Sequence, residues 1–152
     1  MTTRKEAYSF LESYKRKSAK IRLLEIDAQN IESSIHRMTQ MLAGDCGGSH
    51  ESANTQEQMI LGFLIIKDQI AREIAAAAEA RDKVSEVVGV IEGYNEHCAL
   101  VLRSRYISFL SVKRTAKELD YSESRVKQLT QEGADNVAIV LSMMEKGTEE
   151  AV

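Results

Sequence analysis

The sequence predicts an all-α protein in which a long antiparallel coiled-coil helical hairpin is followed by a C-terminal helix-turn-helix bundle. Its 152 residues include no proline, and the long segments consist mainly of Ala, Leu, Ile, Met, Glu, Lys, Arg and Gln, which favour helices. Hydrophobic residues recur at steps of three and four through two long stretches, as in coiled coils. We therefore expect a hairpin at residues 1–93, a helix-turn-helix domain at residues 94–146 and a frayed tail at residues 147–152.

The first helix of the predicted hairpin is marked by one seam of hydrophobic residues. The steps along this seam alternate between three and four, with one position skipped at Lys17. The pattern is typical of a coiled coil rather than of a wide globular face. The seam consists of Ala7, Phe10, Tyr14, Ile21, Leu24, Ala28, Ile31, Ile35, Met38 and Leu42.

The second helix of the hairpin is expected to begin near Thr55 and to carry two rows of residues spaced by seven. One row is wholly hydrophobic. The other includes Lys67 and Arg81, whose aliphatic stems can lie along a seam while their charges stay in water. The first row is Phe63, Ile70, Ala77, Val84 and Ile91, and the hydrophobic members of the second row are Ile60, Ile74 and Val88.

Residues 44–54, GDCGGSHESAN, are expected to connect the two helices as a flexible loop, because Gly, Ser, Asn and Asp favour turns. Two helices of similar length joined by one loop can fold back on each other, and each would be about 50–60 Å long. The first helix is net basic and the second net acidic, which favours antiparallel contact. The alternative is that each seam pairs with another copy of the chain. Dimerisation is expected in addition to the intramolecular hairpin.

After Gly89 and Gly93, the hydrophobic pattern changes to that of shorter helices. Asn95 can cap the first of them, and Gly133 can bend or interrupt the last. The expected helices are Glu96–Phe109, Val112–Leu119 and a third helix from Ser122 onward.

The spacing of residues around Asp120 is typical of a helix-turn-helix, in which two helices cross steeply over a turn of three or four residues. Ala116 supplies the small side chain that such a crossing needs, and Asp120 tolerates the left-handed turn conformation in which glycine is usual. Ser122 can cap the second helix. The alternative is a solvated helical corner with ordinary surface charge. The inner faces would be formed by Thr115, Leu119, Tyr121, Val126 and Leu129.

Candidate DNA-contacting side chains lie on the outer faces of this helix pair. The whole chain has a net charge of −3, which argues against general nucleic-acid binding, but residues 103–129 hold seven basic and three acidic residues, a net +4. Arg, Lys, Gln and Ser can pair with base edges, and basic side chains on the first helix can contact phosphates. Helix 122–132 would lie in the major groove. The base-reading candidates are Glu123, Ser124, Arg125, Lys127, Gln128 and Gln131, and the backbone candidates are Lys113, Arg114, Lys117 and Ser122.

The segment VLRSRYISFLSVKRTAKELDYSESRVKQL resembles region four of sigma factors of the sigma-70 type and of related activators. That family has a VL-x-x-RY helix, a short helix with a central alanine, and then YS-x-x-x-V-x-x-L. The layout of the whole chain is similar to that of small phage and prophage proteins, among them late-transcription regulators of the RinA and ArpU type. The resemblance implies a regulator that docks its second short helix in a major groove and can also touch RNA polymerase. The matching residues are Val101, Leu102, Arg105, Tyr106, Ala116, Leu119, Tyr121, Ser122, Val126 and Leu129.

From these features we predict a sequence-specific transcriptional regulator of phage or prophage origin that binds double-stranded DNA in the cytoplasm of a bacterial host. It would act as a homodimer or higher oligomer formed through the hairpin. One alternative is a protein-interaction module that contacts RNA polymerase without binding DNA. A second is a DNA-packaging recognition subunit of the small-terminase class, which also combines a helix-turn-helix with coiled-coil helices.

Other classes of function are not expected. The sequence contains no nucleophile elbow, zincin motif or phosphate loop, so we expect neither a catalytic site nor a cofactor. No apolar run is long enough for a membrane helix or a signal peptide. The cysteines form no disulfide framework, and the spacing of potential soft ligands does not fit a zinc site. Those ligands are His36, Cys46, His50, His97 and Cys98.

Overall fold

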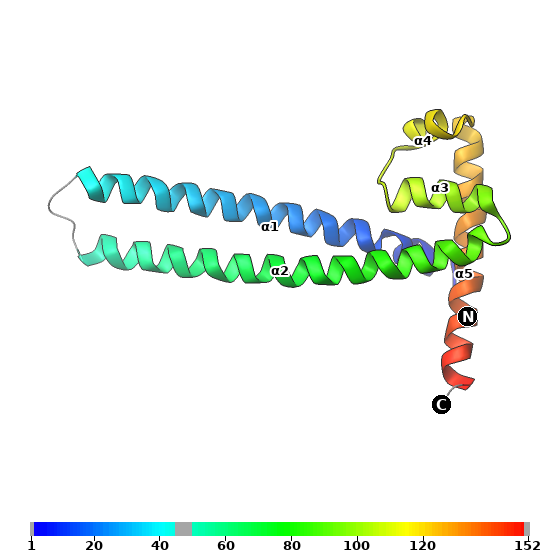
Figure 1. The fold of residues 1–152 in the computed structure, drawn as a ribbon, viewed down its shortest axis with the longest axis horizontal. Coiled ribbons are helices and arrows are strands. Elements are labelled where there is room, and N and C mark those ends of the chain that lie inside the picture. Colours follow the sequence, from blue (N-terminus) through cyan, green and yellow to red (C-terminus); the bar gives the residue numbers. More distant parts are fainter. Residues whose placement is uncertain (1, 45–49, 151–152) are drawn as a thin grey trace. The chain divides into compact units, whose positions relative to one another are not determined.

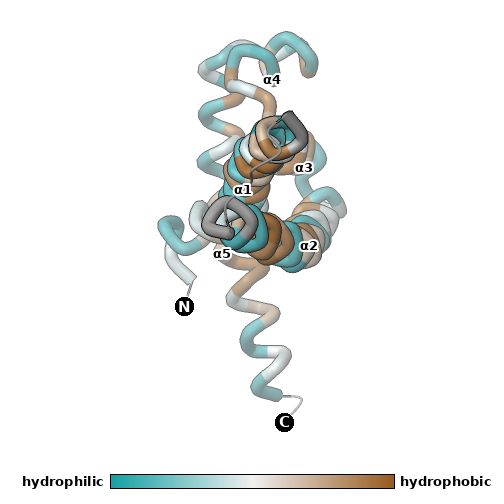
Figure 2. The backbone as a smooth tube through the Cα atoms, turned by 90° about the vertical axis from the view of Figure 1, so that its left-hand side faces the viewer, coloured by the Kyte–Doolittle hydropathy of each residue, from teal (hydrophilic) through white to brown (hydrophobic). Residues whose placement is uncertain are grey.

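The computed structural model describes residues 2–44 and 50–150, and helices hold most of them. No strand occurs among these residues, so the predicted all-α fold is confirmed. Hydrophobic and hydrophilic residues alternate along the helices (Figure 2). The helices are α1 (Arg4–Gly44), α2 (His50–Glu92), α3 (Glu96–Tyr106), α4 (Val112–Leu119) and α5 (Glu123–Glu150) (Figure 1).

The helices form two compact units. The hairpin unit is Lys17–Ala76, and the terminal unit is Met1–Arg16 together with Ala77–Val152. The sequence predicts a division between residues 93 and 94 instead. The observed division differs because the beginning of α1 and the end of α2 bury their apolar side chains in the same core as α3, α4 and α5.

In the hairpin unit, α1 and α2 run antiparallel to each other (Figure 1). Near the connecting end, the side-chain amide of Gln56 donates to Thr39 Oγ1 at 2.8 Å. Farther along, Lys20 Nζ donates to Glu73 Oε1, also at 2.8 Å. Partners 17 and 53 positions apart in the chain are expected when one helix folds back on the other. The predicted intramolecular hairpin is therefore confirmed.

The seam that the sequence predicts on α1 lies in this helix pair. Leu23 and Ile26, which lie outside the seam, are 64% and 47% exposed. The seam members are better covered: Ala28 is buried, and Ile21, Leu24, Ile31, Ile35, Met38 and Leu42 are half-buried.

On α2, one of the two predicted rows is confirmed and the other is wrong within the hairpin unit. Ile60 and Ile74, from the second row, are 41% and 50% exposed. Only Val88 of that row, which belongs to the terminal unit, is buried. One continuous row of covered residues on α2 in the hairpin unit is formed by Phe63 and Ile70 of the first predicted row, together with Met59, Ile66 and Glu73.

The covered row of α2 includes one polar residue, Glu73, and the hydrophobic spacing in the sequence therefore did not reveal this row. Glu73 accepts a hydrogen bond from Lys20 of α1, and this bond lowers the pKa of the Glu73 carboxyl. An ion pair at this position takes the place of a hydrophobic contact, so a search for apolar residues spaced by seven passes over it.

The second helix begins at His50, earlier than the predicted start near Thr55. Residues 50–54 of the predicted loop are therefore helical. This stretch, HESAN, contains neither glycine nor proline, so nothing in it stops the helix from extending. Residues 45–49 of the predicted loop, Cys46 among them, lie outside the described residues.

The terminal unit has one hydrophobic core to which both ends of the chain contribute. Arg4 of α1 holds Asp135 of α5 through two hydrogen bonds, Nε to Oδ1 at 2.7 Å and an Nη2 to Oδ2 bond at 2.8 Å. The hydrogen bond from Arg4 lowers the pKa of the Asp135 carboxyl. The core consists of Ala7, Leu11, Val84, Val87, Val88, Ile91, Cys98, Ala99, Val101, Leu102, Tyr106, Ala116, Val126, Leu129, Ala134, Val137 and Val140.

α5 runs without interruption through Gly133, where the sequence predicts a bend or break. Glycine is needed here for close packing rather than for a turn. A Cβ atom at this position would lie 2.9 Å from Cγ and Cδ2 of Leu102 in α3, which is fully buried. The missing side chain therefore lets α3 approach α5 closely.

The predicted frayed tail is also wrong over residues 147–150, because α5 continues to Glu150. Its last turns contain Met, Glu and Lys, which favour helices, and Thr148 Oγ1 donates to the Met144 carbonyl at 2.9 Å. Residues 151–152 lie outside the described residues.

We expect Gly133→Ala to destabilise the protein even though alanine favours helices by about 1 kcal/mol over glycine. The added methyl group must displace the buried Leu102 side chain, which should cost about 1–3 kcal/mol. Urea denaturation followed by circular dichroism checks this. Gly147→Ala, on the same helix with nothing within 4 Å of the added Cβ, is the matched control and should be neutral or stabilising. Equal effects of the two substitutions would contradict the close-packing role.

Candidate nucleic-acid interface

α4 and α5 are joined by a tight turn at Asp120, Tyr121 and Ser122. Asp120 ends α4 in the left-handed conformation, with φ 58° and ψ 44°, and its N–H donates to the Ala116 carbonyl. The N–H of Tyr121 donates to the same carbonyl at 2.9 Å. The predicted turn at Asp120 is thus confirmed, and it reverses the chain without glycine because aspartate tolerates this conformation.

Both helices of the pair begin at a serine cap. Ser111 Oγ accepts from the N–H of Arg114 at 3.1 Å, and Ser122 Oγ accepts from the N–H of Arg125 at 3.1 Å. Each cap satisfies an amide that has no partner within its helix. The predicted cap at Ser122 is confirmed. Its hydroxyl hydrogen is not used by this bond and can donate to another acceptor.

The inner faces of α4 and α5 pack as the spacing predicts. Thr115 and Ala116 of α4 are buried, as are Val126 and Leu129 of α5. Leu119 and Tyr121 are half-buried and pack against this core. Because Val126 and Leu129 point into the core, the opposite side of the first turns of α5 is directed to solvent.

α3 supports the turn through His97, which the sequence did not single out for this role. His97 Nδ1 lies 2.6 Å from the hydroxyl of Tyr121, and the two rings meet edge to face with centroids 6.1 Å apart. The predicted cap of α3 is present as well, since Asn95 Oδ1 accepts from the N–H of Cys98 at 3.2 Å. α3 therefore positions the turn that precedes α5.

The connection between α3 and α4 is shaped by Phe109, which has a positive φ of 59°. α3 ends at Tyr106, with Ile107 as its C-cap, rather than at the predicted Phe109. The Phe109 ring stacks on Tyr14 of α1 with centroids 5.1 Å apart. Arg105 Nη1 donates to the Leu110 carbonyl at 2.8 Å and ties the connection to α3. No local signal in the sequence marks the left-handed phenylalanine.

All six base-reading candidates are exposed at the start of α5. Ser124, Gln128 and Gln131 follow one another at steps of four and three, which places them on one stripe of the helix. Arg125 and Gln128 are brought together, because Arg125 Nη1 donates to Gln128 Oε1 at 3.0 Å. The other members of the set are Glu123 and Lys127.

The backbone candidates on α4 gather around a hollow of about 420 Å³. Lys113, Arg114 and Lys117 line it together with Ser111 and Glu118. Arg114 Nε lies 3.9 Å from Glu118 Oε1, a long contact between two exposed groups that contributes little. Three cations beside the capped start of a helix are an arrangement that suits a phosphate oxygen.

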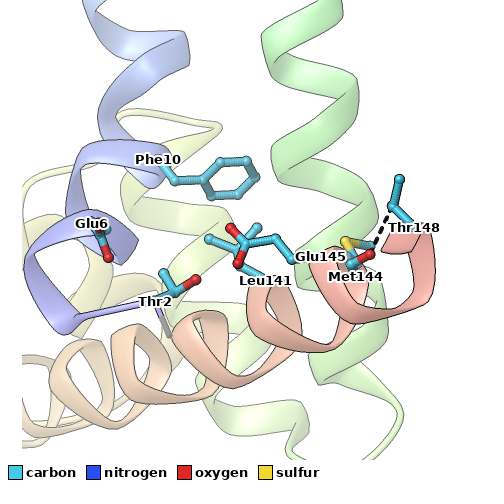
Figure 3. A pocket seen from close by; sticks show the side chains of 7 residues that line it. All are labelled: Thr2, Glu6, Phe10, Leu141, Met144, Glu145 and Thr148. Atoms are coloured by element: carbon cyan, nitrogen blue, oxygen red, sulfur yellow. Dashed lines mark hydrogen bonds between the residues drawn. The ribbon is translucent and has the colours of Figure 1, made fainter. Parts of the chain in front are cut away.

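A second hollow, of about 530 Å³, lies between the start of α1 and the end of α5 (Figure 3). Its polar side chains are two carboxylates and two hydroxyls, with no histidine, cysteine or basic group among the lining residues. Glu6 accepts hydrogen bonds from Thr3, which lower its pKa. This lining offers neither a catalytic pair of nucleophile and base nor a cluster of cations that could bind an anion. It consists of Thr2, Glu6, Phe10, Leu141, Met144, Glu145 and Thr148.

Among the described residues, no three His, Cys, Asp or Glu side chains converge in a way that could hold a metal ion. Cys98 is buried in the core, and burial raises the pKa of its thiol, as expected for a small packing residue. None of the described helices is long and apolar enough to cross a membrane.

Comparisons of the chain with models of protein families, with curated proteins and with solved structures give no match.

The turn makes a specific prediction at Asp120. Asp120→Gly should preserve or slightly raise stability, because glycine adopts the left-handed conformation freely. Asp120→Val should cost about 1–2 kcal/mol or more, since a β-branched side chain clashes in that conformation. Thermal unfolding of the two variants beside the wild type measures the difference. Equal stabilities for Gly and Val at this position would show that the left-handed turn is not required.

Proposed function

We propose that the protein is a sequence-specific transcriptional regulator of phage or prophage origin that binds double-stranded DNA. In this proposal the first turns of α5 enter the major groove, and α4 lies against the phosphate backbone. The protein would act without catalysis, in the cytoplasm of its bacterial host, and could contact RNA polymerase as the resemblance to region four implies.

The observation that carries the proposal is the α4–turn–α5 geometry together with the side chains that it exposes. The helix start is fixed by the Ser122 cap and by the buried pair Val126 and Leu129. A reading helix needs such a rigid start, because base contacts depend on placing side chains to within a fraction of an ångström. The exposed candidates then offer the amides of Gln128 and Gln131 and the guanidinium of Arg125, which match the edges of adenine and guanine.

The charges support different roles for α4 and α5 in DNA binding. α4 has three basic side chains around one hollow, where they can neutralise phosphates without regard to sequence. α5 presents Arg125 and Lys127 among neutral polar groups and the acidic Glu123. The acidic balance of the whole chain would suppress binding away from this surface.

The hairpin would set the number of recognition helices. We propose that the protein is a homodimer or higher oligomer, formed through the hairpin unit. A dimer would present two copies of α5 and should prefer two half-sites at a fixed spacing.

The decisive test is fluorescence anisotropy with DNA fragments tiled across the protein's own gene neighbourhood, at two salt concentrations. One fragment should bind tightly at the higher salt. Arg125→Ala/Lys127→Ala should weaken that binding by about tenfold or more, because each lost base contact costs roughly 1–3 kcal/mol, while weak binding to other fragments persists.

The α4 cations should behave differently in the same assay. Lys113→Ala/Arg114→Ala/Lys117→Ala should weaken binding to every fragment and reduce the slope of log affinity against log salt by up to about three. Lys146→Ala, an exposed lysine near the end of α5, is the control and should change neither quantity. Weak, uniform binding that salt abolishes, or no binding at all, would overturn the proposal. A pull-down of RNA polymerase would then test the interaction-module alternative, and ring-sized oligomers in light scattering would support the DNA-packaging class.

A further inference from the structure

α2 carries a second hydrophobic seam in the hairpin unit, and α1 leaves it uncovered. Ile60, Leu64 and Ile74 are 41%, 56% and 50% exposed, and Ala71 is exposed as well. Together with Lys67, they follow one another at steps of four, three, four and three, the spacing of a coiled-coil seam. These five residues form the outer seam of α2.

The outer seam is displaced by one residue from the seam that α1 covers. Each of its members follows directly after a covered residue, as Ile60 follows Met59 and Ile74 follows Glu73. One residue is a rotation of about 100° around a helix. In a four-helix bundle, the two neighbours of each helix lie at about a right angle around it. α2 is therefore patterned to contact α1 and one further helix.

The further helix has to supply an apolar seam of its own. α1 has none beside its covered seam, because the flanking rows are polar apart from Leu23. These rows are Arg22, Glu25, Gln29 and Glu32 on one side, and Lys20, Asp27, Asn30 and Ser34 on the other. Within the described residues of the hairpin unit, only α2 has a second seam. We propose that a second copy of the chain covers the outer seam with its own outer seam, so that α2 packs against α2 of the partner.

The exposed apolar area is sufficient for this pairing. The outer-seam isoleucines and Leu64, with the flanking Leu61 at 59% exposure, leave roughly 400 Å² of apolar surface per copy. Two copies would bury about 800 Å², and because interfaces are about 60% apolar, the total would be roughly 1,300 Å². With these side chains fully buried, that area lies at the lower end of the range of stable protein interfaces.

The orientation follows from the sizes of the seam residues. A parallel pair would set Leu64 against Leu64 and Ala71 against Ala71. An antiparallel pair centred near Lys67 sets Leu64 of one copy against Ala71 of the other, so a large side chain meets a small one. We therefore expect the antiparallel pair.

The proposed function includes an oligomer, and the α2–α2 interface says where its copies meet. Only the biological role of the interface rests on the proposed function. The molecular mass of the protein is measured without DNA, so failure of the interface can be distinguished from failure of DNA binding. A protein that dimerises but does not bind DNA would refute the regulator, whereas a DNA-binding monomer would refute the interface.

Light scattering coupled to size-exclusion chromatography tests the interface over a range of protein concentrations. The wild type should have twice the mass of the chain, and Leu64→Glu/Ile74→Glu should shift to the monomer mass, with at least a hundredfold rise in the dimer dissociation constant. Ile65→Glu is the matched control: Ile65 is 64% exposed on the same helix but lies outside the outer seam. Circular dichroism checks that the variants remain helical.

Three outcomes would overturn the interface: a monomeric wild type, a double variant that stays dimeric, or an Ile65→Glu variant that dissociates as readily as the double variant.

The orientation of the two α2 helices is tested by disulfide cross-linking of single cysteines in a Cys46→Ser background, since Cys98 is buried. Lys67→Cys, near the middle of the outer seam, should form an intermolecular disulfide. Ile60→Cys should not, because antiparallel pairing separates the two copies of this position beyond disulfide reach. Efficient cross-linking at both positions would show a parallel pair.

Discussion

The close approach of α3 to α5 at Gly133 is the constraint on which the helix-turn-helix depends. Leu102 lies where a side chain of residue 133 would be, and this contact sets α3 against the middle of α5. From that position His97 reaches the hydroxyl of Tyr121 in the turn. This turn determines where α5 begins and which of its side chains are exposed. A single missing methyl group is thus linked through packing and hydrogen bonds to the presentation of the candidate DNA-contacting residues.

The local elements of this arrangement could be predicted from the sequence because their causes are local. Ser122 caps α5 through an amide three residues away, and Asp120 forms a turn that depends mainly on its own backbone conformation. The heptad seam of α1 was visible because its covered positions are apolar, with the one exception of Lys17. These features depend on residues within one or two helical turns of each other, and spacing along the chain reports them directly.

The features that escaped prediction depend on distant partners. Glu73 belongs to the covered row of α2 because Lys20 bonds to it from α1, and Phe109 adopts a positive φ where its ring stacks on Tyr14. Gly133 was expected to weaken α5, since glycine disfavours helices, and only the position of Leu102 shows why it is tolerated. The outward direction of the candidate DNA-contacting set followed from the apolar spacing of α5. Its support by α3 did not, because no short-range pattern encodes it.

The shared core of the terminal unit has a consequence for how the protein folds during synthesis. Ala7 and Leu11, from the first turns of α1, are fully buried in a core that also needs Val137 and Val140 near the end of the chain. The hairpin unit lies between these segments in the sequence. Its cross-helix hydrogen bonds join residues 17 and 53 positions apart, whereas the bond between Arg4 and Asp135 in the terminal unit spans 131 positions. The hairpin unit can fold as soon as Ala76 has left the ribosome, whereas the terminal unit must wait for α5. Ala7 and Leu11 are therefore synthesised well before the residues that bury them. A fragment that begins at residue 94 would lack part of the core against which α3 and α5 pack.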